Sequence, residues 1–407
     1  MTRGSSDGGR CKLRGMDLSP YSARLKEPVK AKLPDLASPE RLYHMIFADQ
    51  LTPHILNKLF RSADSIREIS RSREGLLFLR TILADKRAML YFTQTSTRTF
   101  LSFVGACQLL GMPYAEVRDP SISSEAKGEH PLDSMRMFSS YFDLIIIRDK
   151  HPGFAESCAY MMNDLRRVHR RGVPIVNGGS GADEHPTQAL LDLFTIQRSF
   201  DFAAPTDTDH SSRYEDLRGR HPGLRKGMAG KKYVFCGDIG RGRTVRSLAL
   251  LLARYPSVEL HFVAPPIEGL RLSGELKSRL IRAGAEVFEH SSLDAVVGEA
   301  DLVYMTRAQK EHDKSGAAGV DWGDFVLTPS RLDKMKEYAP VLHPFPRNEE
   351  IPFEIDEDPR AMYFRQARNG MWVRAALLAH LFDAEAAITE YHQTEYATFH
   401  DYNSSVL

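Results

Sequence analysis

The chain has 407 residues, more than one hydrophobic core usually organises, so its length predicts two domains with a cleft between them. Its 54 lysine and arginine residues nearly balance 53 acidic residues, which excludes the strongly basic field that would draw the whole protein to nucleic acid or to an anionic membrane. Four scattered cysteines indicate neither a disulfide framework nor a zinc site, and no apolar run approaches the roughly 18 residues of a membrane span, so we expect a cytoplasmic protein with reduced thiols.

The start of the chain, residues 1–40, is rich in Ser, Gly, Lys and Arg and lacks the apolar core of a secretory signal. We expect a disordered extension, and a transit peptide is the alternative interpretation.

Helical and strand patterns alternate in the first half of the chain. Apolar residues recur at helical spacing from Leu51 to Ile69, Ala88–Phe92 is a short apolar run, and a helical stripe resumes at Phe100. The same interpretation gives a helix near Leu132–Tyr141, a strand at Leu144–Ile147, a helix after Phe154, a strand at Val173–Val176 and a helix at Pro186–Phe200. Such alternation predicts a parallel sheet flanked by helices.

Residues 202–230 interrupt this pattern because they are polar and show little apolar periodicity. A second alternating series follows, with strands at Tyr233–Cys236, Val258–Val263, Leu302–Met305 and Val341–Leu342, and helices at Val245–Arg254, Gly274–Ala283, near Leu293, and at Pro329–Met335. A last amphipathic helix is predicted at Trp372–Leu381. We therefore predict an α/β protein with two doubly wound parallel-sheet domains and the active site in the cleft between them. The predicted segments are an extension (1–40), a first domain (41–195), an insertion or linker (196–230), a second domain (231–368), and a helix with a tail (369–407) that returns to the first domain.

A hydroxyl-rich tetrapeptide, Ser96-Thr97-Arg98-Thr99, lies between a predicted strand and a predicted helix. Free N–H groups and the positive end of the helix dipole favour an anion at such a position, and the hydroxyls with the Arg98 guanidinium complete a phosphate site. The alternative interpretation is an ordinary helix cap followed by a solvated arginine.

Two further segments follow predicted strands. His185-Pro186-Thr187-Gln188 comes after a glycine-rich loop and places an imidazole and an amide at the carboxyl edge of the first sheet, where ligands bind. Arg243 belongs to a glycine-rich turn after the strand at Tyr233–Cys236. A nucleotide-binding loop is the competing interpretation of this turn, but the G-x-G-x-x-G order is absent.

The last strands of the second domain also end in polar residues. Arg307 and Gln309 suit carboxylate recognition, and Pro344-Phe345-Pro346 forms a stiff loop that presents carbonyl oxygens. With Arg148 at the end of another strand, these segments supply cations but no evident nucleophile or metal cluster. We therefore expect no metal and no organic cofactor, and the pocket suits transfer between two small anions.

These motifs resemble the aspartate and ornithine carbamoyltransferase family over residues 51–381. Ser-Thr-Arg-Thr is typical of the whole superfamily. The aspartate branch is indicated by His185–Asp192, Gly242-Arg243-Thr244, Thr306-Arg307 with Gln309, and the Pro344–Pro346 loop. The resemblance implies transfer of the carbamoyl group from carbamoyl phosphate to L-aspartate, which gives N-carbamoyl-L-aspartate and phosphate in pyrimidine biosynthesis. It also implies that residues 41–195 bind carbamoyl phosphate and residues 231–368 bind aspartate.

The resemblance also assigns roles to residues. It implies that Ser96, Thr97, Arg98 and Thr99 hold the phosphate, that Thr99, Arg148 and His185 polarise the carbamoyl carbonyl, and that Gln188, Pro344 and Phe345 hold the carbamoyl amino group. Arg243 is expected to bind the α-carboxylate of aspartate, and Arg307 with Gln309 its side-chain carboxylate.

A polar segment at residues 123–129 resembles a family loop that enters a neighbouring subunit's site, where Ser123 and Lys127 contact substrate. The resemblance therefore implies a homotrimer with shared active sites, in which Lys127 is catalytic, and regulatory chains are a further expectation. On the segment alone, a solvated loop is the alternative.

Several positions depart from the family pattern. Gln94 and Thr95 precede the tetrapeptide, where the family usually has Glu-Pro or Glu-Ala. His312 replaces an arginine that usually pairs with that glutamate. Phe100 and Val104 replace an arginine and a glutamate, and Phe345 replaces a leucine. These departures keep two alternatives open: a different amino acceptor, or an inactive homologue with a structural or regulatory role.

Overall fold

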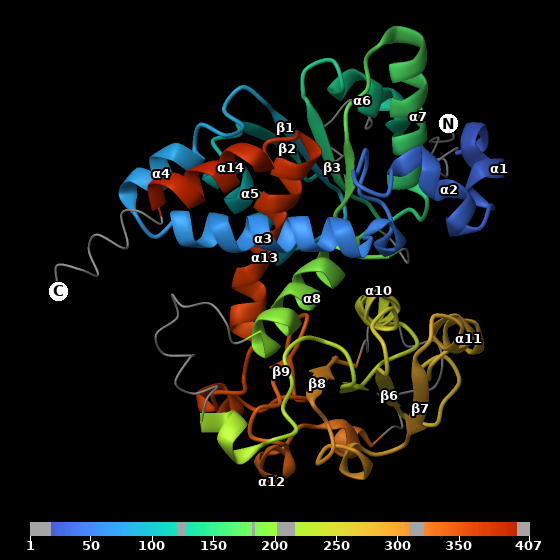
Figure 1. Cartoon of the computed structure of the whole chain (residues 1–407). Helices are drawn as coiled ribbons and strands as arrows, with labels where there is room; N and C mark the ends of the chain where they lie inside the picture. Colours follow the sequence, from blue (N-terminus) through green and yellow to red (C-terminus); the bar gives the residue numbers. More distant parts are fainter. Residues whose placement is uncertain (1–17, 120–126, 181–183, 202–215, 309–320, 397–407) are drawn as a thin grey trace, which may run out of the picture.

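Two parallel sheets form the frame of the protein in the computed structural model, which describes residues 18–119, 127–180, 184–201, 216–308 and 321–396 (Figure 1). The first sheet has the order β2-β1-β3-β4 and the second the order β7-β6-β5-β8-β9. The first-sheet strands are β1 (Ala88–Phe92), β2 (Tyr114–Val117), β3 (Leu144–Arg148) and β4 (Ile175–Asn177). The second-sheet strands are β5 (Lys232–Cys236), β6 (Glu259–Val263), β7 (Glu286–His290), β8 (Leu302–Met305) and β9 (Val341–Leu342). The predicted α/β class with two doubly wound sheets is confirmed.

The strand orders decide where a ligand can bind. In the first sheet, the chain leaves β1 toward β2 on one side and later returns to β3 on the other side, so the order reverses between β1 and β3. The second sheet reverses in the same way between β5 and β8. Ligands of open parallel sheets bind beyond the carboxyl ends of the strands at such reversals. The polar segments after β1, β3, β5 and β8 therefore lie at both reversal points.

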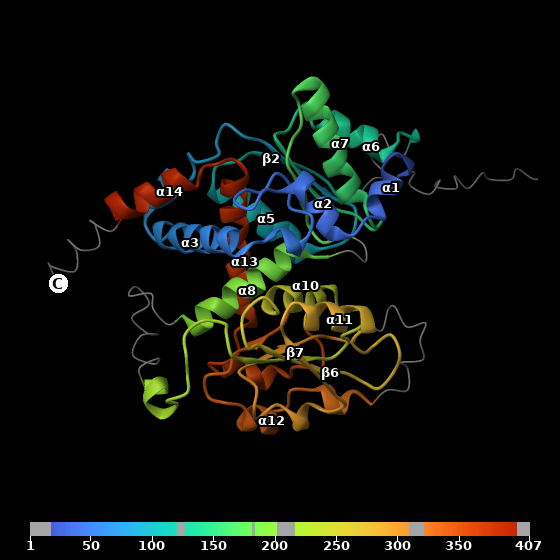
Figure 2. The same cartoon turned by 45° about the vertical axis from the view of Figure 1, so that its right-hand side comes forward.

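Helices cover the sheets of both domains. In the first domain these are α3 (Pro53–Ile69), α4 (Arg73–Leu79), α5 (Thr97–Leu109), α6 (Pro131–Phe138) and α7 (Phe154–His169). In the second domain they are α10 (Arg243–Leu252), α11 (Gly274–Arg282) and α12 (Pro329–Lys334). Figure 2 shows α10 and α11 on the side of the second sheet that faces the first domain.

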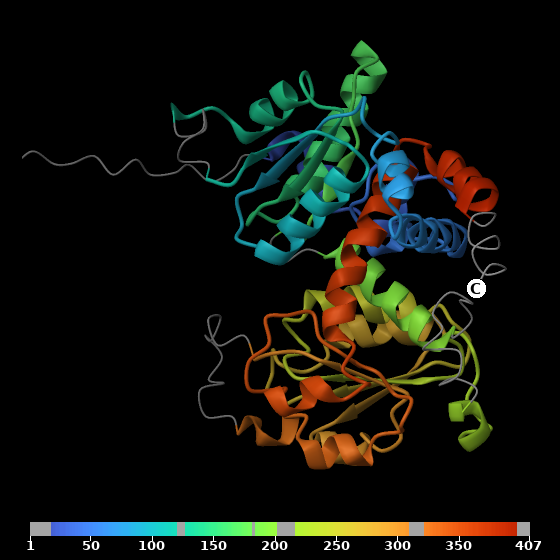
Figure 3. The same cartoon turned by 90° about the vertical axis from the view of Figure 1, so that its left-hand side faces the viewer.

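Two long helices, α8 (Pro186–Phe200) and α13 (Tyr363–Leu381), join the domains, and a short helix α14 (Glu385–Tyr391) follows α13. Figure 3 shows α13 passing from the second domain into the first. Its first residue, Tyr363, packs in the core around β8 and β9, whereas Val373 and Leu377 pack in the core that α3 and α5 share. The helix thus begins before the predicted boundary at residue 369, because its amino end belongs to the second domain.

A three-way ion pair also joins the domains. Asp49 of the first domain accepts from Arg254 at 2.8 Å and from Arg279 at 3.2 Å, and Arg254 also donates to the carbonyl oxygen of Leu51 at 2.7 Å. Both arginines belong to the second domain, so these contacts link the two domains.

Two other predicted segments differ from the structure. Disorder was expected over residues 1–40, but the described part contains α1 (Ser22–Leu25) and α2 (Val29–Leu36), and α2 lies against α7 (Figure 1). A buried ion pair between Lys32 and Glu156, with N and O 2.7 Å apart, and the fully buried Leu36 explain this order. The linker predicted from residue 196 starts too early, because α8 continues to the buried Phe200.

Candidate active site

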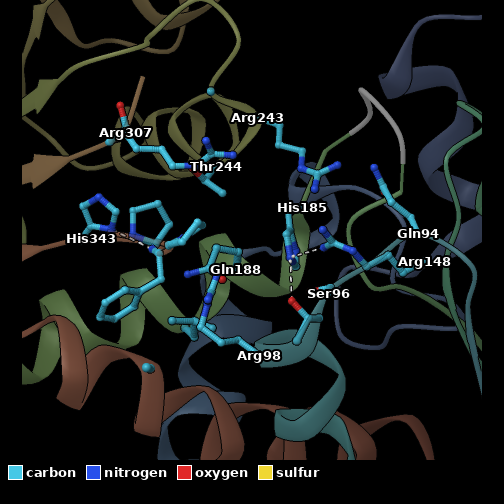
Figure 4. Close-up of a pocket in the computed structure, with 18 of the residues that line it drawn as sticks. Gln94, Ser96, Arg98, Arg148, His185, Gln188, Arg243, Thr244, Arg307 and His343 are labelled. Atoms are coloured by element: carbon cyan, nitrogen blue, oxygen red, sulfur yellow. Dashed lines mark hydrogen bonds between the residues drawn. The ribbon is translucent and has the colours of Figure 1, made fainter. Parts of the chain in front are cut away.

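A cavity of about 1010 Å³ lies between the domains at the carboxyl ends of both sheets (Figure 4). Segments from both halves of the chain line it, and they include most of the predicted site residues. These are Ser96, Thr97, Arg98, Thr99, Arg148, His185, Gln188, Arg243, Arg307, Pro344 and Phe345. The structure therefore brings residues that are more than half the chain apart into one site.

Three helices begin at the cavity without a capping side chain. They are α5, with Ser96 at its N-cap, α8, with His185, and α10, with Gly242, and none of these residues forms a side-chain cap hydrogen bond. By contrast, α3, α4, α11 and α12 are capped by the side chains of Thr52, Ser72, Ser273 and Thr328. First-turn N–H groups need partners, and the helix dipole favours a negative one. The uncapped ends therefore suit anionic ligands.

His185 is the meeting point of the first-domain side chains. Its Nε2 atom lies 3.4 Å from Oγ1 of Thr99 and 3.4 Å from Nη1 of Arg148, which also donates to the carbonyl oxygen of Gly178 at 3.1 Å. Figure 4 shows His185 directed toward Arg148. A hydroxyl, an imidazole and a guanidinium thus converge on one point. The guanidinium can only donate, so Nε2 accepts from Arg148 in this structure and donates to a substrate carbonyl oxygen in the other tautomer.

The imidazole of His185 is neutral at neutral pH. Burial lowers its pKa well below the ordinary value, and the positive charges of Arg148, Arg243 and Arg374 lower it further. A neutral imidazole is a hydrogen-bond donor that keeps its proton, so His185 suits polarisation of a carbonyl better than proton transfer.

The cavity is strongly positive. Of the described residues that line it, eight are arginines or lysines (Arg98, Arg148, Lys150, Arg241, Arg243, Arg246, Arg307 and Arg374) and one, Asp238, is acidic. Burial and the nearby Arg243, Arg374 and Arg98 lower the pKa of Arg148 to about 9. Burial and then Arg307 lower the pKa of Arg98. Anionic substrates relieve this repulsion, so the cavity suits two negatively charged substrates.

Phe345 contacts the phosphate-binding segment predicted from the sequence. Its backbone has φ 57°, and its ring centroid lies 5.7 Å from the guanidinium carbon of Arg98. An aromatic face attracts a cation at this distance. The larger side chain, in place of the leucine expected from the resemblance, therefore lies against the guanidinium of Arg98.

Two of the other departures, Phe100 and Val104, have a local explanation in the structure. Phe100 and Val104 are both buried in the first-domain core, and Phe100 packs edge-on against Phe92 with ring centroids 5.4 Å apart. An apolar pair thus replaces a charged pair on one helix face. The Oε1 atom of Gln94 is buried at the cavity without a hydrogen-bond partner. His312 lies outside the described residues.

Three predicted site residues are not placed in the cavity. Lys127 is exposed and does not line it. Ser123 and Gln309 lie outside the described residues. The contributions of these residues therefore stay predictions.

Sequence reasoning missed Arg374 and the contacts of Asp192. Arg374 is buried on α13, lines the cavity, and donates to Oγ of Ser102 at 2.7 Å. An arginine within the apolar run Trp372–Leu381 was the available signal, because a buried arginine requires partners. The contacts of Asp192 had no comparable signal in the sequence.

The described part of the chain contains no cluster of three or more His, Cys, Asp or Glu residues placed to hold a metal ion. Its helices also include none with the length and apolar character needed to cross a membrane.

Known proteins with similar sequences and structures fit this geometry. Residues 43–198 match the model of the aspartate/ornithine carbamoyltransferase carbamoyl-P binding domain, and residues 229–381 match that of the Asp/Orn binding domain. Aspartate carbamoyltransferase 3, chloroplastic, from Pisum sativum is 36% identical over 341 residues, which cover 83% of this chain and 77% of the relative. The aspartate carbamoyltransferase catalytic subunit of Vibrio campbellii is 34% identical over 338 residues, which cover 83% and 95%.

A solved structure of aspartate transcarbamoylase from Trypanosoma cruzi in complex with carbamoyl phosphate and aspartate superposes with a TM-score of 0.65 at 29% identity. The match covers 85% of this chain and 97% of the other.

Proposed function

The chain belongs to the aspartate/ornithine carbamoyltransferase family and transfers the carbamoyl group of carbamoyl phosphate to L-aspartate, and we propose how its residues divide this work. The observation that carries the proposal is the positive interdomain cavity, in which the uncapped start of α5 and the cluster of Thr99, Arg148 and His185 lie together.

Carbamoyl phosphate binds in the first-domain half of the cavity. The N–H groups at the start of α5, the hydroxyls of Ser96, Thr97 and Thr99, and the guanidinium of Arg98 hold its phosphate. Its carbonyl oxygen accepts from Thr99, Arg148 and His185, and its amino group donates to Gln188 and to the carbonyls of the Pro344–Phe345 loop. These contacts fix the carbamoyl carbon at the opening toward the second domain.

L-Aspartate binds in the second-domain half. Arg243 at the start of α10 holds the α-carboxylate, and Arg307 after β8, with Gln309, holds the side-chain carboxylate. The amine then attacks the carbamoyl carbon, the oxyanion that forms is stabilised by Thr99, Arg148 and His185, and the C–O bond to phosphate breaks. The leaving phosphate takes the amine proton. Holding both reactants in this geometry contributes on the order of 7–11 kcal/mol.

The test of this function is an assay with carbamoyl phosphate, an acceptor panel and colorimetric detection of ureido products. We expect N-carbamoyl-L-aspartate as the main product. A higher kcat/KM with another amino acid would support the alternative acceptor, and no turnover at saturating substrates would contradict the proposal.

Replacing Arg307 should weaken aspartate binding selectively. For Arg307→Ala we expect KM for aspartate to rise about a hundredfold, because loss of a charge-paired carboxylate contact costs about 2–5 kcal/mol. Inhibition by inorganic phosphate, which reports on the first-domain half of the cavity, should stay within about twofold of wild type. An unchanged KM for aspartate would remove Arg307 from the acceptor site.

We further propose a cytoplasmic homotrimer in which Lys127 and Ser123 complete the active site of a neighbouring subunit. The exposure of Lys127 outside its own cavity supports this arrangement. The binding of regulatory chains to such a trimer is a separate expectation.

Subunit complementation tests shared sites directly. Lys127→Ala and Arg98→Ala should each be nearly inactive, yet their co-expression should restore up to about one quarter of wild-type activity, because some mixed interfaces join an intact Arg98 to an intact Lys127. Mixtures that stay inactive, or a fully active monomer in sedimentation, would refute sharing.

A further inference from the structure

Asp192 is a buried carboxylate that joins three elements around the cavity. It lies one turn beyond Gln188 on α8 and is fully buried. Its Oδ1 accepts from Nε2 of Gln188 at 2.8 Å and from Nε2 of Gln366 on α13 at 2.6 Å, and its Oδ2 accepts from the hydroxyl of Tyr304 on β8 at 2.7 Å. Burial raises its pKa to about 6, and the three hydrogen bonds oppose that rise. The carboxylate is therefore ionised at neutral pH.

An ionised carboxylate only accepts hydrogen bonds, so Asp192 determines the orientation of the Gln188 amide group. The NH₂ group must face Asp192, because the opposite orientation would place the amide oxygen against a negative charge. The remaining polar atom of the amide, Oε1, is an acceptor, and Gln188 lines the cavity. The carbamoyl amino group requires an acceptor there.

The same constraint passes through Gln366 to the loop on the other side of the cavity. Gln366 donates its NH₂ to Asp192, so its Oε1 is left to accept, and it accepts from the backbone N–H of His343 at 2.8 Å. His343 begins the loop that carries Pro344 and Phe345, and its Nδ1 accepts from the N–H of Phe345 at 2.8 Å. Asp192 thus orients both sets of acceptors proposed for the carbamoyl amino group.

We propose that Asp192 is a positioning residue for the carbamoyl group: it turns the oxygen of Gln188 into the cavity and, through Gln366, sets the backbone of the His343–Phe345 loop. This inference rests on the role proposed above for Gln188. Asp192 itself does not touch substrate.

The first test is Asp192→Asn. An amide in this position presents one acceptor oxygen to three donors, so at least one donor must turn away. We expect kcat/KM for carbamoyl phosphate to fall about thirtyfold, while inhibition by inorganic phosphate stays within about twofold of wild type. Phosphate lacks the carbamoyl group, so a general loss of site structure would weaken phosphate binding as well and would overturn the proposal.

A double-mutant cycle separates positioning from an independent effect. Gln188→Ala alone tests the proposed function, because an unchanged kcat/KM would remove Gln188 from the carbamoyl site. If Asp192 acts through Gln188, Asp192→Asn in the Gln188→Ala background should lower kcat/KM by only about threefold. A further thirtyfold fall in that background would overturn the inference and leave the role of Gln188 intact.

The chain offers a matched control at the same helix interface. Asn369 of α13 donates to Oγ1 of Thr195 of α8 at 3.0 Å, one turn from the Asp192–Gln366 contact and outside the cavity lining. Thr195→Val should lower the Tm and leave kcat/KM within about twofold of wild type.

If Asp192→Asn does not fold, Gln366→Leu keeps the inference testable. It removes both hydrogen bonds of Gln366, leaves the contact between Asp192 and Gln188 in place, and should lower kcat/KM for carbamoyl phosphate about threefold, with phosphate inhibition unchanged. Full activity of this folded variant would overturn the Gln366 part of the inference.

Discussion

Arg98→Ala is expected to lower kcat/KM for carbamoyl phosphate about a thousandfold. Arg98 lies at the start of α5, and Phe345 places an aromatic face over its guanidinium. It is proposed to neutralise the phosphate in the ground state and the charge that grows on the leaving oxygen, so its loss affects both binding and the chemical step. Steady-state kinetics with varied carbamoyl phosphate, and inhibition by inorganic phosphate, would measure the two effects separately.

Two variants give this prediction its controls. Arg98→Lys keeps the charge but loses the bidentate geometry, and should fall between Arg98→Ala and wild type. Arg61→Ala, on the exposed face of α3, should have wild-type kinetics. If Arg98→Ala retained kcat/KM within about tenfold of wild type, the phosphate site would have to lie elsewhere in the cavity.

His185→Ala is expected to lower kcat by about a hundredfold to a thousandfold, the usual effect of removing one donor to an oxyanion. The imidazole is placed by α8 with its Nε2 between Thr99 and Arg148. Because it is proposed to contact an oxygen that becomes negative only during attack, the KM for carbamoyl phosphate should change much less than kcat.

The pH dependence distinguishes a neutral donor from a proton-transfer residue. The pKa of His185 is held well below its ordinary value by burial and by three arginines, so its protonation state should not change between pH 6 and 8. His185→Gln, which also supplies a neutral N–H, should retain more activity than His185→Ala and give a pH profile of the wild-type shape. A wild-type break near pH 6.5 that disappears in His185→Gln would instead indicate proton transfer.

The buried strands could be predicted from the sequence, but two partly exposed edge strands could not. β1 and β3 are fully buried, and their sequences are short apolar runs. The prediction of both strands is confirmed. β2 and β7 were missed because they are partly exposed and contain glutamate, whereas β4 and β9, which also lie at sheet edges, are buried and were predicted. The pairing of β2 and β7 depends on a neighbouring strand rather than on their own hydrophobicity.

The sequence by itself determined the two α/β domains and the polar segments that are proposed to bind substrate. Each segment is local: a strand ends, a helix begins, and the residues between them are polar. Backbone geometry alone then places free N–H groups and side chains at the edge of a sheet, so Ser96–Thr99, His185 and Arg243 could be recognised without knowledge of their neighbours.

Only the tertiary structure decided how these segments are held relative to one another. Asp192 meets Gln366 across 174 residues and Tyr304 across 112, and Arg374 reaches Ser102 across 272. Such contacts have no local pattern, because a buried polar side chain must find its partners wherever packing brings them. The residues proposed to contact substrate could therefore be identified in the sequence, whereas the buried residues proposed to orient them could be identified only from the arrangement of the two domains around α8 and α13.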